Sequence, residues 1–250
     1  MRPIMRALVA GGLLTVAPDV SATELNATVP DEITSEAKMS DRWTNDMVRL
    51  EKLHQTAYRT GDHERIIAES AKILSQVQRD SGDQSFDFAT MLNAHAMFLN
   101  AADRPAEARP LLAQSLQLSH DLVGERHRLT LRNLHNYAFV LVRLGENKSA
   151  VPYFDLALRL RSEVLGEFDS QTMLTRVNYA GLLLRLDRAQ EAEPLFAVSL
   201  ASSRQLLGET HGMTIRSRKG YATALAKLGR GEEAKSVLAG QDNLPAAIPS

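Results

Sequence analysis

The chain carries two successive amphipathic patterns, and both have the spacing of an α-helix. The first pattern consists of Leu131, Leu134, Ala138 and Leu141, with Tyr137 and Leu144 beside them. The second follows Gly145, stops at Gly166, and consists of Ala150, Tyr153, Phe154, Ala157, Leu158, Arg161, Val164 and Leu165. The two patterns predict a helix A and a helix B joined by a tight turn, so a helical hairpin is the expected structural unit.

This hairpin recurs along the chain with a step of 42 residues. Three sets of small or turn-forming residues keep that step: the glycines Gly82, Gly124, Gly166 and Gly208; the alanines Ala96, Ala138, Ala180 and Ala222 with Ala108, Ala150, Ala192 and Ala234; and the turn residues Gly61, Asp103, Gly145, Asp187 and Gly229. Self-similarity at a fixed period indicates stacked units. The sequence therefore predicts an all-α solenoid of antiparallel helix pairs.

The repeating small residues have physical reasons. A glycine after helix B can adopt the left-handed conformation that closes a helix. Asp103 and Asp187 replace glycine at the turn between helices A and B, and aspartate enters the left-handed region more readily than most residues. The alanines are expected where two helices cross so closely that a larger side chain would separate their backbones.

The residues of one unit resemble the tetratricopeptide repeat. The resemblance rests on small residues at Ala138, Ala150 and Ala157 with Leu134, Tyr137, Leu141, Gly145 and Phe154 between them. The repeat length, the Leu165-Gly166 and Leu207-Gly208 helix ends, Thr172, Thr214 and the run Asn178-Tyr179-Ala180 make it most similar to the kinesin-light-chain-type subfamily. That subfamily usually has a His-Pro pair where this chain has His127-Arg128, Asp169-Ser170 and His211-Gly212, so the proline is never kept. The resemblance covers about residues 44–240, and the solenoid we expect is a right-handed superhelix.

The expected units span about 44–85, 86–127, 128–169, 170–211 and 212–240. The first is degenerate, with His54 and Ile66 where the others have alanine, as terminal units often are. The last has a short helix B from Glu232 to Ala239, so Val237 and Leu238 are expected to be partly exposed. That exposure favours either a frayed end or a surface for self-association. A flexible leader is predicted over 23–43, and a disordered tail over 241–250.

The N-terminus has the pattern of a secretory signal over residues 1–22. Arg2 and Arg6 precede an uncharged apolar stretch at 7–17, and Val20-Ser21-Ala22 offers the small residues that a signal peptidase recognises. At about 1.5 Å per residue this stretch spans roughly half of a ~30 Å hydrocarbon core, so a retained membrane anchor is the weaker alternative. Cleavage after Ala22 is expected, and no stable membrane span would then remain. The mature chain would be periplasmic or secreted.

Composition and motifs argue against several classes of activity. The chain has 250 residues, 29 Lys+Arg, 30 Asp+Glu, a formal net charge of −1 and no cysteine. Near-neutral charge argues against a general nucleic-acid binder, and the lack of cysteine excludes disulfides, thiolate metal sites and cysteine nucleophiles. No two of the 7 histidines are three or four residues apart, and there is no Gly-x-Ser-x-Gly motif. We therefore expect no enzyme, no metal site and no cofactor.

Charge is nevertheless sorted along the chain. The A helices expected at about 129–144, 171–186 and 213–228 contain no Asp or Glu, and their cations are Arg132, Arg143, Arg176, Arg185, Arg216, Arg218, Lys219 and Lys227. One stripe of the first of these helices lies opposite its apolar face and consists of Arg132, Asn136, Phe139 and Arg143. The same positions recur one and two units later, and they include Asn178, Arg185, Arg216 and Lys227.

The family resemblance implies that this stripe lines a concave groove that holds an extended peptide. Arg143, Arg185 and Lys227 would then form a basic ladder, and Asn136 and Asn178 could pair with a peptide main chain. Arginine can bind a carboxylate through two hydrogen bonds, so the expected ligand is an acidic or C-terminal peptide segment. Nucleic acid is disfavoured, because the stripe has few aromatic side chains.

A simpler alternative is that these cations pair with acids on neighbouring B helices, such as Glu146, Asp155, Glu191 and Glu193, and only keep the surface soluble. Groove binding is favoured because three helices without any acid exceed what solubility requires. The sequence thus predicts an exported, non-enzymatic module that binds a protein or peptide. The alternative function is a structural subunit that self-associates through its C-terminal repeat, so a homo-oligomer stays open.

Overall fold

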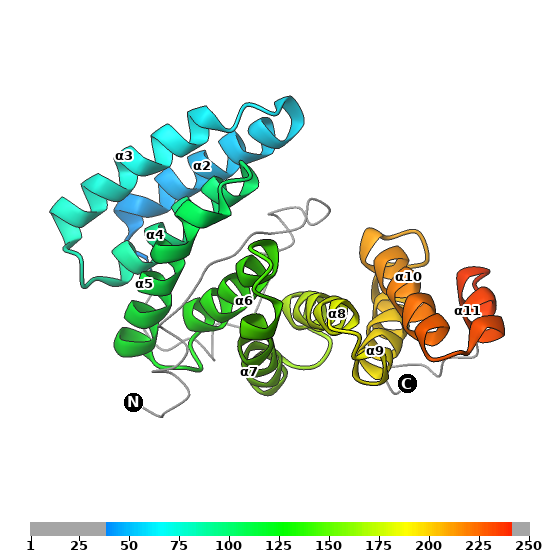
Figure 1. The fold of residues 1–250 in the computed structure, drawn as a ribbon. Coiled ribbons are helices and arrows are strands. Elements are labelled where there is room, and N and C mark those ends of the chain that lie inside the picture. The colour runs from blue at the N-terminus through cyan, green and yellow to red at the C-terminus, as the bar shows by residue number, and fades with distance from the viewer. Residues whose placement is uncertain (1–38, 242–250) are drawn as a thin grey trace. The chain divides into compact units, whose positions relative to one another are not determined.

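The computed structural model describes residues 39–241, and within that range the chain forms helices and turns but no strand. The helices make five consecutive hairpins (Figure 1). They are α2 (Asp41–Thr60) with α3 (Glu64–Ser81), α4 (Phe86–Ala101) with α5 (Pro105–Val123), α6 (Arg128–Arg143) with α7 (Asn147–Leu165), α8 (Ser170–Arg185) with α9 (Ala189–Leu207), and α10 (Gly212–Lys227) with α11 (Gly231–Leu238). The all-α prediction is confirmed. The predicted signal sequence, most of the leader and nearly all of the tail lie outside the described residues.

The described chain divides into two compact units, and the division falls within α7 after Ala157. In the first unit, α4 packs against its own partner α5 and also beside the A helices α2 and α6. In the second unit, α10 packs in the same way against α9, α11 and the A helix α8. Each hairpin therefore buries its apolar face against neighbouring hairpins of its own unit, as a small unit without a core of its own must.

The repeating small residues are buried, as close packing of helices requires. All eight of the repeating alanines are buried: Ala96, Ala138, Ala180, Ala222, Ala108, Ala150, Ala192 and Ala234. At one recurring position of helix B the large side chains Leu112, Phe154 and Phe196 are also buried. Alternation of small and large side chains lets the helices approach closely while the remaining volume is filled.

The glycines that follow α3, α5 and α9 differ from the prediction in one angle. Gly124 has the expected positive φ of 83°, but its ψ is 172°. Gly208 is similar, with φ 86° and ψ 171°. Such an extended conformation with positive φ lies outside the left-handed helical region and is almost exclusive to glycine. The ψ angle is extended because the chain must leave helix B and run toward the next helix A.

The turn aspartates do adopt the predicted conformation. Asp103 and Asp187 have φ values of 59° and 57°, and they are the non-glycine residues with positive φ in the described part of the chain.

The positions at which the subfamily usually has histidine are helix N-caps. The Nδ1 atoms of His127 and His211 accept hydrogen bonds from the backbone N–H groups of Leu129 and Met213, at 3.1 and 3.2 Å. Asp169 does the same for Gln171 and Thr172 through its carboxylate. A histidine and an aspartate are interchangeable here because both offer an acceptor to the free N–H groups of the first helical turn.

The C-terminal hairpin is short, since α11 has 8 residues whereas α7 and α9 have 19. Contrary to the expectation that both residues are partly exposed, Val237 is buried and only Leu238 is exposed, at 56%. Among the described residues, no helix has the length and apolar character needed to span a membrane.

Candidate peptide-binding face

The three A helices that carry the predicted site contain no acidic residue over their observed lengths. This holds for α6, which lies in the first unit, and for α8 and α10, which lie in the second. Helix α6 begins at Arg128, one residue earlier than the pattern indicated, so Arg128 adds a cation that sequence reasoning missed. The N-cap at His127 was the signal that could have located it.

Arg128 and Arg132 lie one helical turn apart at the start of α6. The Nε atom of Arg132 is buried and has no hydrogen-bond partner among the described residues. Burial, and then the positive charge of Arg128, lowers the pKa of Arg132 to about 10. No ion pair joins Arg128 or Arg132 to a carboxylate within residues 39–241, so positive charge is concentrated at the start of α6, next to the positive end of the helix dipole.

Asn136 is engaged inside the fold. It is 7% exposed, and its Nδ2 donates to the Oδ1 of Asn93 on α4 at 3.3 Å. Asn93 in turn donates to Asn133 at 2.6 Å, and Asn133 donates to the hydroxyl of Ser115 on α5 at 2.8 Å. The amide nitrogen that was expected to meet a peptide thus belongs to a buried network that ties α4, α5 and α6 together.

The remaining predicted residues of α6 are closer to the surface. Phe139 is half-buried and stacks on His135, with ring centroids 6.2 Å apart. Arg143 is exposed, and its guanidinium pairs with Asp103, which belongs to the turn after α4.

In the second unit, Asn178 and Arg216 are brought together. The guanidinium of Arg216 on α10 donates to the Oδ1 of Asn178 on α8. Two predicted site residues from adjacent A helices are therefore in direct contact, as the repeat register requires.

Arg185 and Lys227 end helices α8 and α10, and both are exposed. Lys227 pairs with Asp187 of the turn after α8. This ion pair, through its hydrogen bond and its charge, lowers the pKa of Asp187. Within the described part of the second unit, no acid lies within ion-pair distance of Arg185.

The simpler alternative named the wrong acids. Glu146 pairs with Arg109 at 3.1 Å, Glu191 with Arg188 at 2.6 Å, and Glu193 with Arg230 at 3.1 Å. The A-helix cations instead use acids of turns and links: besides the two turn aspartates, Glu167 pairs with Arg176 and Glu209 with Arg218. Burial lowers the pKa of Arg176, which is 3% exposed, so that ion pair is structural.

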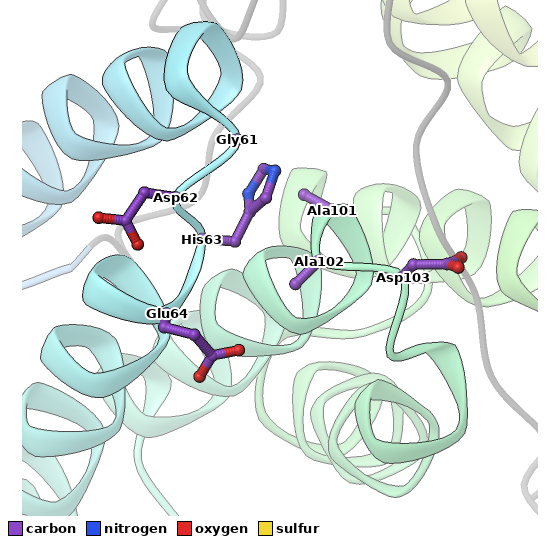
Figure 2. A pocket seen from close by; sticks show the side chains of 7 residues that line it. All are labelled: Gly61, Asp62, His63, Glu64, Ala101, Ala102 and Asp103. Carbon is purple, nitrogen blue, oxygen red and sulfur yellow. The ribbon is translucent and has the colours of Figure 1, made fainter.

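An open pocket of about 340 Å³ lies in the first unit between the α2–α3 and α4–α5 turns (Figure 2). It is lined by Gly61, Asp62, His63 and Glu64 of the first turn and by Ala101, Ala102 and Asp103 of the second, and the carboxylates of Asp62 and Asp103 point in opposite directions. Glu64 is held by Arg104 at 3.3 Å, and Asp103 by Arg143. Within the described residues, no three His, Cys, Asp or Glu side chains are grouped so that they could bind a metal.

Comparison with known proteins agrees with the helical hairpins. A family model of the tetratricopeptide repeat matches residues 87–163 and 170–239. The chain belongs to the tetratricopeptide-repeat (TPR) family. TPR proteins generally mediate protein–protein interactions, and their fold is typically a non-enzymatic scaffold.

Two crystal structures of putative kinesin light chain TPR-like repeats from Podosopora anserina share the TPR fold of this chain. The first, which carries a point substitution, has a TM-score of 0.69 and 16% identity, over 82% of this chain and 95% of that chain. The second has a TM-score of 0.67 and 16% identity, over 78% of this chain and 92% of that chain. No curated protein matches the sequence.

Proposed function

We propose that this TPR protein is an exported, non-enzymatic adaptor that binds an acidic segment of a protein partner along its A helices. The observation that carries the proposal is the absence of Asp and Glu from α6, α8 and α10, which together supply nine Lys and Arg residues. A chain of formal net charge −1 does not produce such segregation by composition alone.

Preorganisation is the mechanism that we infer. The A helices are fixed by their burial against the B helices, so their side chains are in place before the partner arrives. Only the bound segment must then lose conformational freedom, which lowers the entropic cost of association. Opposite charge on the partner would speed the encounter, and salt would weaken it.

A charge-reversal experiment tests the proposal. Arg143, Arg185 and Lys227 are changed together to glutamate, and the matched control reverses Arg65, Lys148 and Arg159, which are exposed on B helices. Partners are captured by crosslinking in the native compartment and identified by mass spectrometry. We expect the first variant to lose the partners that the wild type and the control retain. Equal capture by both variants would refute binding through the A helices.

Export is tested separately, because it rests on residues 1–22. Cell fractionation should place the protein in the periplasm or the medium, and N-terminal sequencing of that material should begin at Thr23. A cytoplasmic protein that begins at Met1 would overturn this part of the proposal.

One observation favours the second function, self-association through the C-terminal repeat. Leu238 is 56% exposed at the register position where Phe154 and Phe196 are buried. Light scattering across a range of concentrations distinguishes the two functions. A mass that stays monomeric removes self-association, whereas a mass that rises and falls again in a Leu238→Glu variant supports it.

A further inference from the structure

The first hairpin, α2–α3, meets α4 through side chains that are more polar than those at the same register positions of later hairpins. Three positions carry the difference: Ser70 on α3, His54 on α2 and His95 on α4. In later repeats these positions hold Leu112, Phe154 and Phe196; Ala96, Ala138, Ala180 and Ala222; and Tyr137, Tyr179 and Tyr221. Two positions that are uncharged elsewhere at neutral and mildly acidic pH are therefore histidines here.

Both histidine rings lie where α2 and α3 pack against α4 (Figure 1). The centroid of the His54 ring is 5.4 Å from that of Phe98, and the Nδ1 atom of His54 is buried without a hydrogen-bond partner among the described residues. The Nδ1 atom of His95 lies 2.8 Å from the hydroxyl of Ser70, and both residues are buried. One ring thus joins α2 to α4 and the other joins α3 to α4.

Protonation would place a positive charge on each ring at this contact. Burial is the largest effect on both groups, and it lowers the pKa of His54 and of His95. The facing side chains on α4 and α3, Phe98 and Ser70, are uncharged. The charges that act on the rings are those of Glu51 and His63 on His54, and those of Arg104 and Glu107 on His95. The two acids favour the protonated rings and the two other groups oppose them, so burial decides the direction.

We propose that the first hairpin is an acid-sensitive element, docked on α4 at neutral pH and released as the pH falls below about 6.5, while α4 and α5 stay folded. The docked hairpin favours neutral rings, whereas after release both rings take up protons at their ordinary pKa of about 6.5. Falling pH therefore shifts the equilibrium toward release. A released hairpin has no neighbour against which to bury its apolar face, so it unfolds, and Phe98 on α4 is uncovered.

Trp43 makes this release measurable in the full chain. It is the one tryptophan of the sequence, it is buried on α2, and its Nε1 donates to the hydroxyl of Ser81 on α3 at 3.3 Å. Titration from about pH 8 to about pH 5 should shift the Trp43 emission to longer wavelength below about pH 6.5. Unchanged emission down to about pH 5 would overturn the proposal.

Hydrogen exchange followed by mass spectrometry locates the opening. After correction for the intrinsic exchange rates, protection factors in α2 and α3 should fall roughly tenfold to a hundredfold between about pH 7.5 and about pH 5.5, with up to tenfold from each histidine. Amides of α5 should stay more protected than those of α2 and α3. Loss of protection in α5 to the same level would mean that the whole unit unfolds, and release of the hairpin alone would be wrong.

The double variant His54→Asn, His95→Asn removes both titrations. Its protection factors in α2 and α3 should change less than about twofold over the same pH range. Because the readout is the dependence on pH, the variant is informative even if its hairpin docks more weakly. His95→Tyr, which installs the residue of the later A helices, should halve the logarithmic pH effect.

The matched control is His120→Gln, which removes a histidine whose ring contacts Asp121 on its own helix α5. It should respond to acid as the wild type does. A pH response in the double variant equal to that of the wild type would assign the release to other groups and refute the role of the two histidines.

Discussion

At the scale of single residues, two glycines inside A helices have opposite surroundings. A Cβ atom at Gly220 would lie 2.2 Å from the Cε1 atom of Phe196, whose ring packs against α10. A Cβ at Gly181 would meet nothing within 4 Å. Substitution by alanine should therefore lower the free energy of unfolding at Gly220 and raise it at Gly181.

We expect Gly220→Ala to lower the free energy of unfolding by about 1–3 kcal/mol, since the Phe196 ring must move. Gly181→Ala should raise it by about 0.5–1 kcal/mol, because alanine restricts the unfolded chain and fits the helix. Urea unfolding of the two variants and the wild type measures both values. Destabilisation of equal size in both would contradict the packing at Phe196.

His95 gives a prediction about acid. Its ring is buried, its Nδ1 lies 2.8 Å from the Ser70 hydroxyl, and burial followed by the charge of Arg104 lowers the pKa of His95. The folded protein thus favours the neutral ring, while the unfolded chain takes up a proton near its ordinary pKa of about 6.5. The free energy of unfolding should fall as the pH drops below about 6.5, because the unfolded state binds more protons.

The variant His95→Asn keeps a hydrogen-bonding side chain and removes the titration. Its free energy of unfolding should depend less on pH than that of the wild type between about pH 7 and pH 5. Urea titrations at several pH values provide the slope. An unchanged slope would assign the acid sensitivity to other groups, of which His54, also lowered in pKa by burial, is one.

At the scale of helices, the caps decide where each A helix starts. Asp169 accepts hydrogen bonds from the N–H groups of Gln171 at 2.9 Å and Thr172 at 3.2 Å. Asp169→Ala should cost about 1 kcal/mol, because two donors of the first turn lose their acceptor. The control is Asp155→Ala, which removes an exposed acid from α7. Thermal unfolding compares the two, and equal melting temperatures would argue against the cap.

Helix positions followed from sequence because the apolar period, the glycines and the alanines all agreed in register. The sequence also contains a further regularity that marks the start of each helix B. Pro110, Pro152 and Pro194 keep the 42-residue step and lie in the second turn of α5, α7 and α9. A proline there loses a single backbone hydrogen bond near the helix start, so it marks helix B without breaking it.

The ion pairs could not be predicted in the same way. Sequence gives the charge of a helix but not which acid its long side chains reach. Asp103 was explained by its backbone conformation alone, whereas its contact with Arg143 depends on how one hairpin packs on the next. Asn136 was assigned to the ligand for the same reason, because a helical stripe does not reveal the buried amide of Asn93 on the neighbouring helix.

At the scale of the whole molecule, residues at the same register position contribute differently to stability, depending on where their hairpin lies in the chain. Phe196 is 3% exposed, and Leu238, at the same register position one repeat later, is 56% exposed. Phe196→Ala should cost about 3–5 kcal/mol, because it leaves a cavity between hairpins. Leu238→Ala should change stability by less than about 0.5 kcal/mol. Chemical denaturation of both variants measures the contrast, and a large loss at Leu238 would show that something covers it.

The space beside Gly220, which the Phe196 ring occupies, also has a use in protein engineering. A designed hairpin whose first helix carries glycine at the corresponding place could receive Leu238 as α10 receives Phe196. Because each hairpin touches only its neighbours, the inner repeats would not need to be redesigned. The array could then be lengthened one module at a time, and its binding surface extended for longer targets.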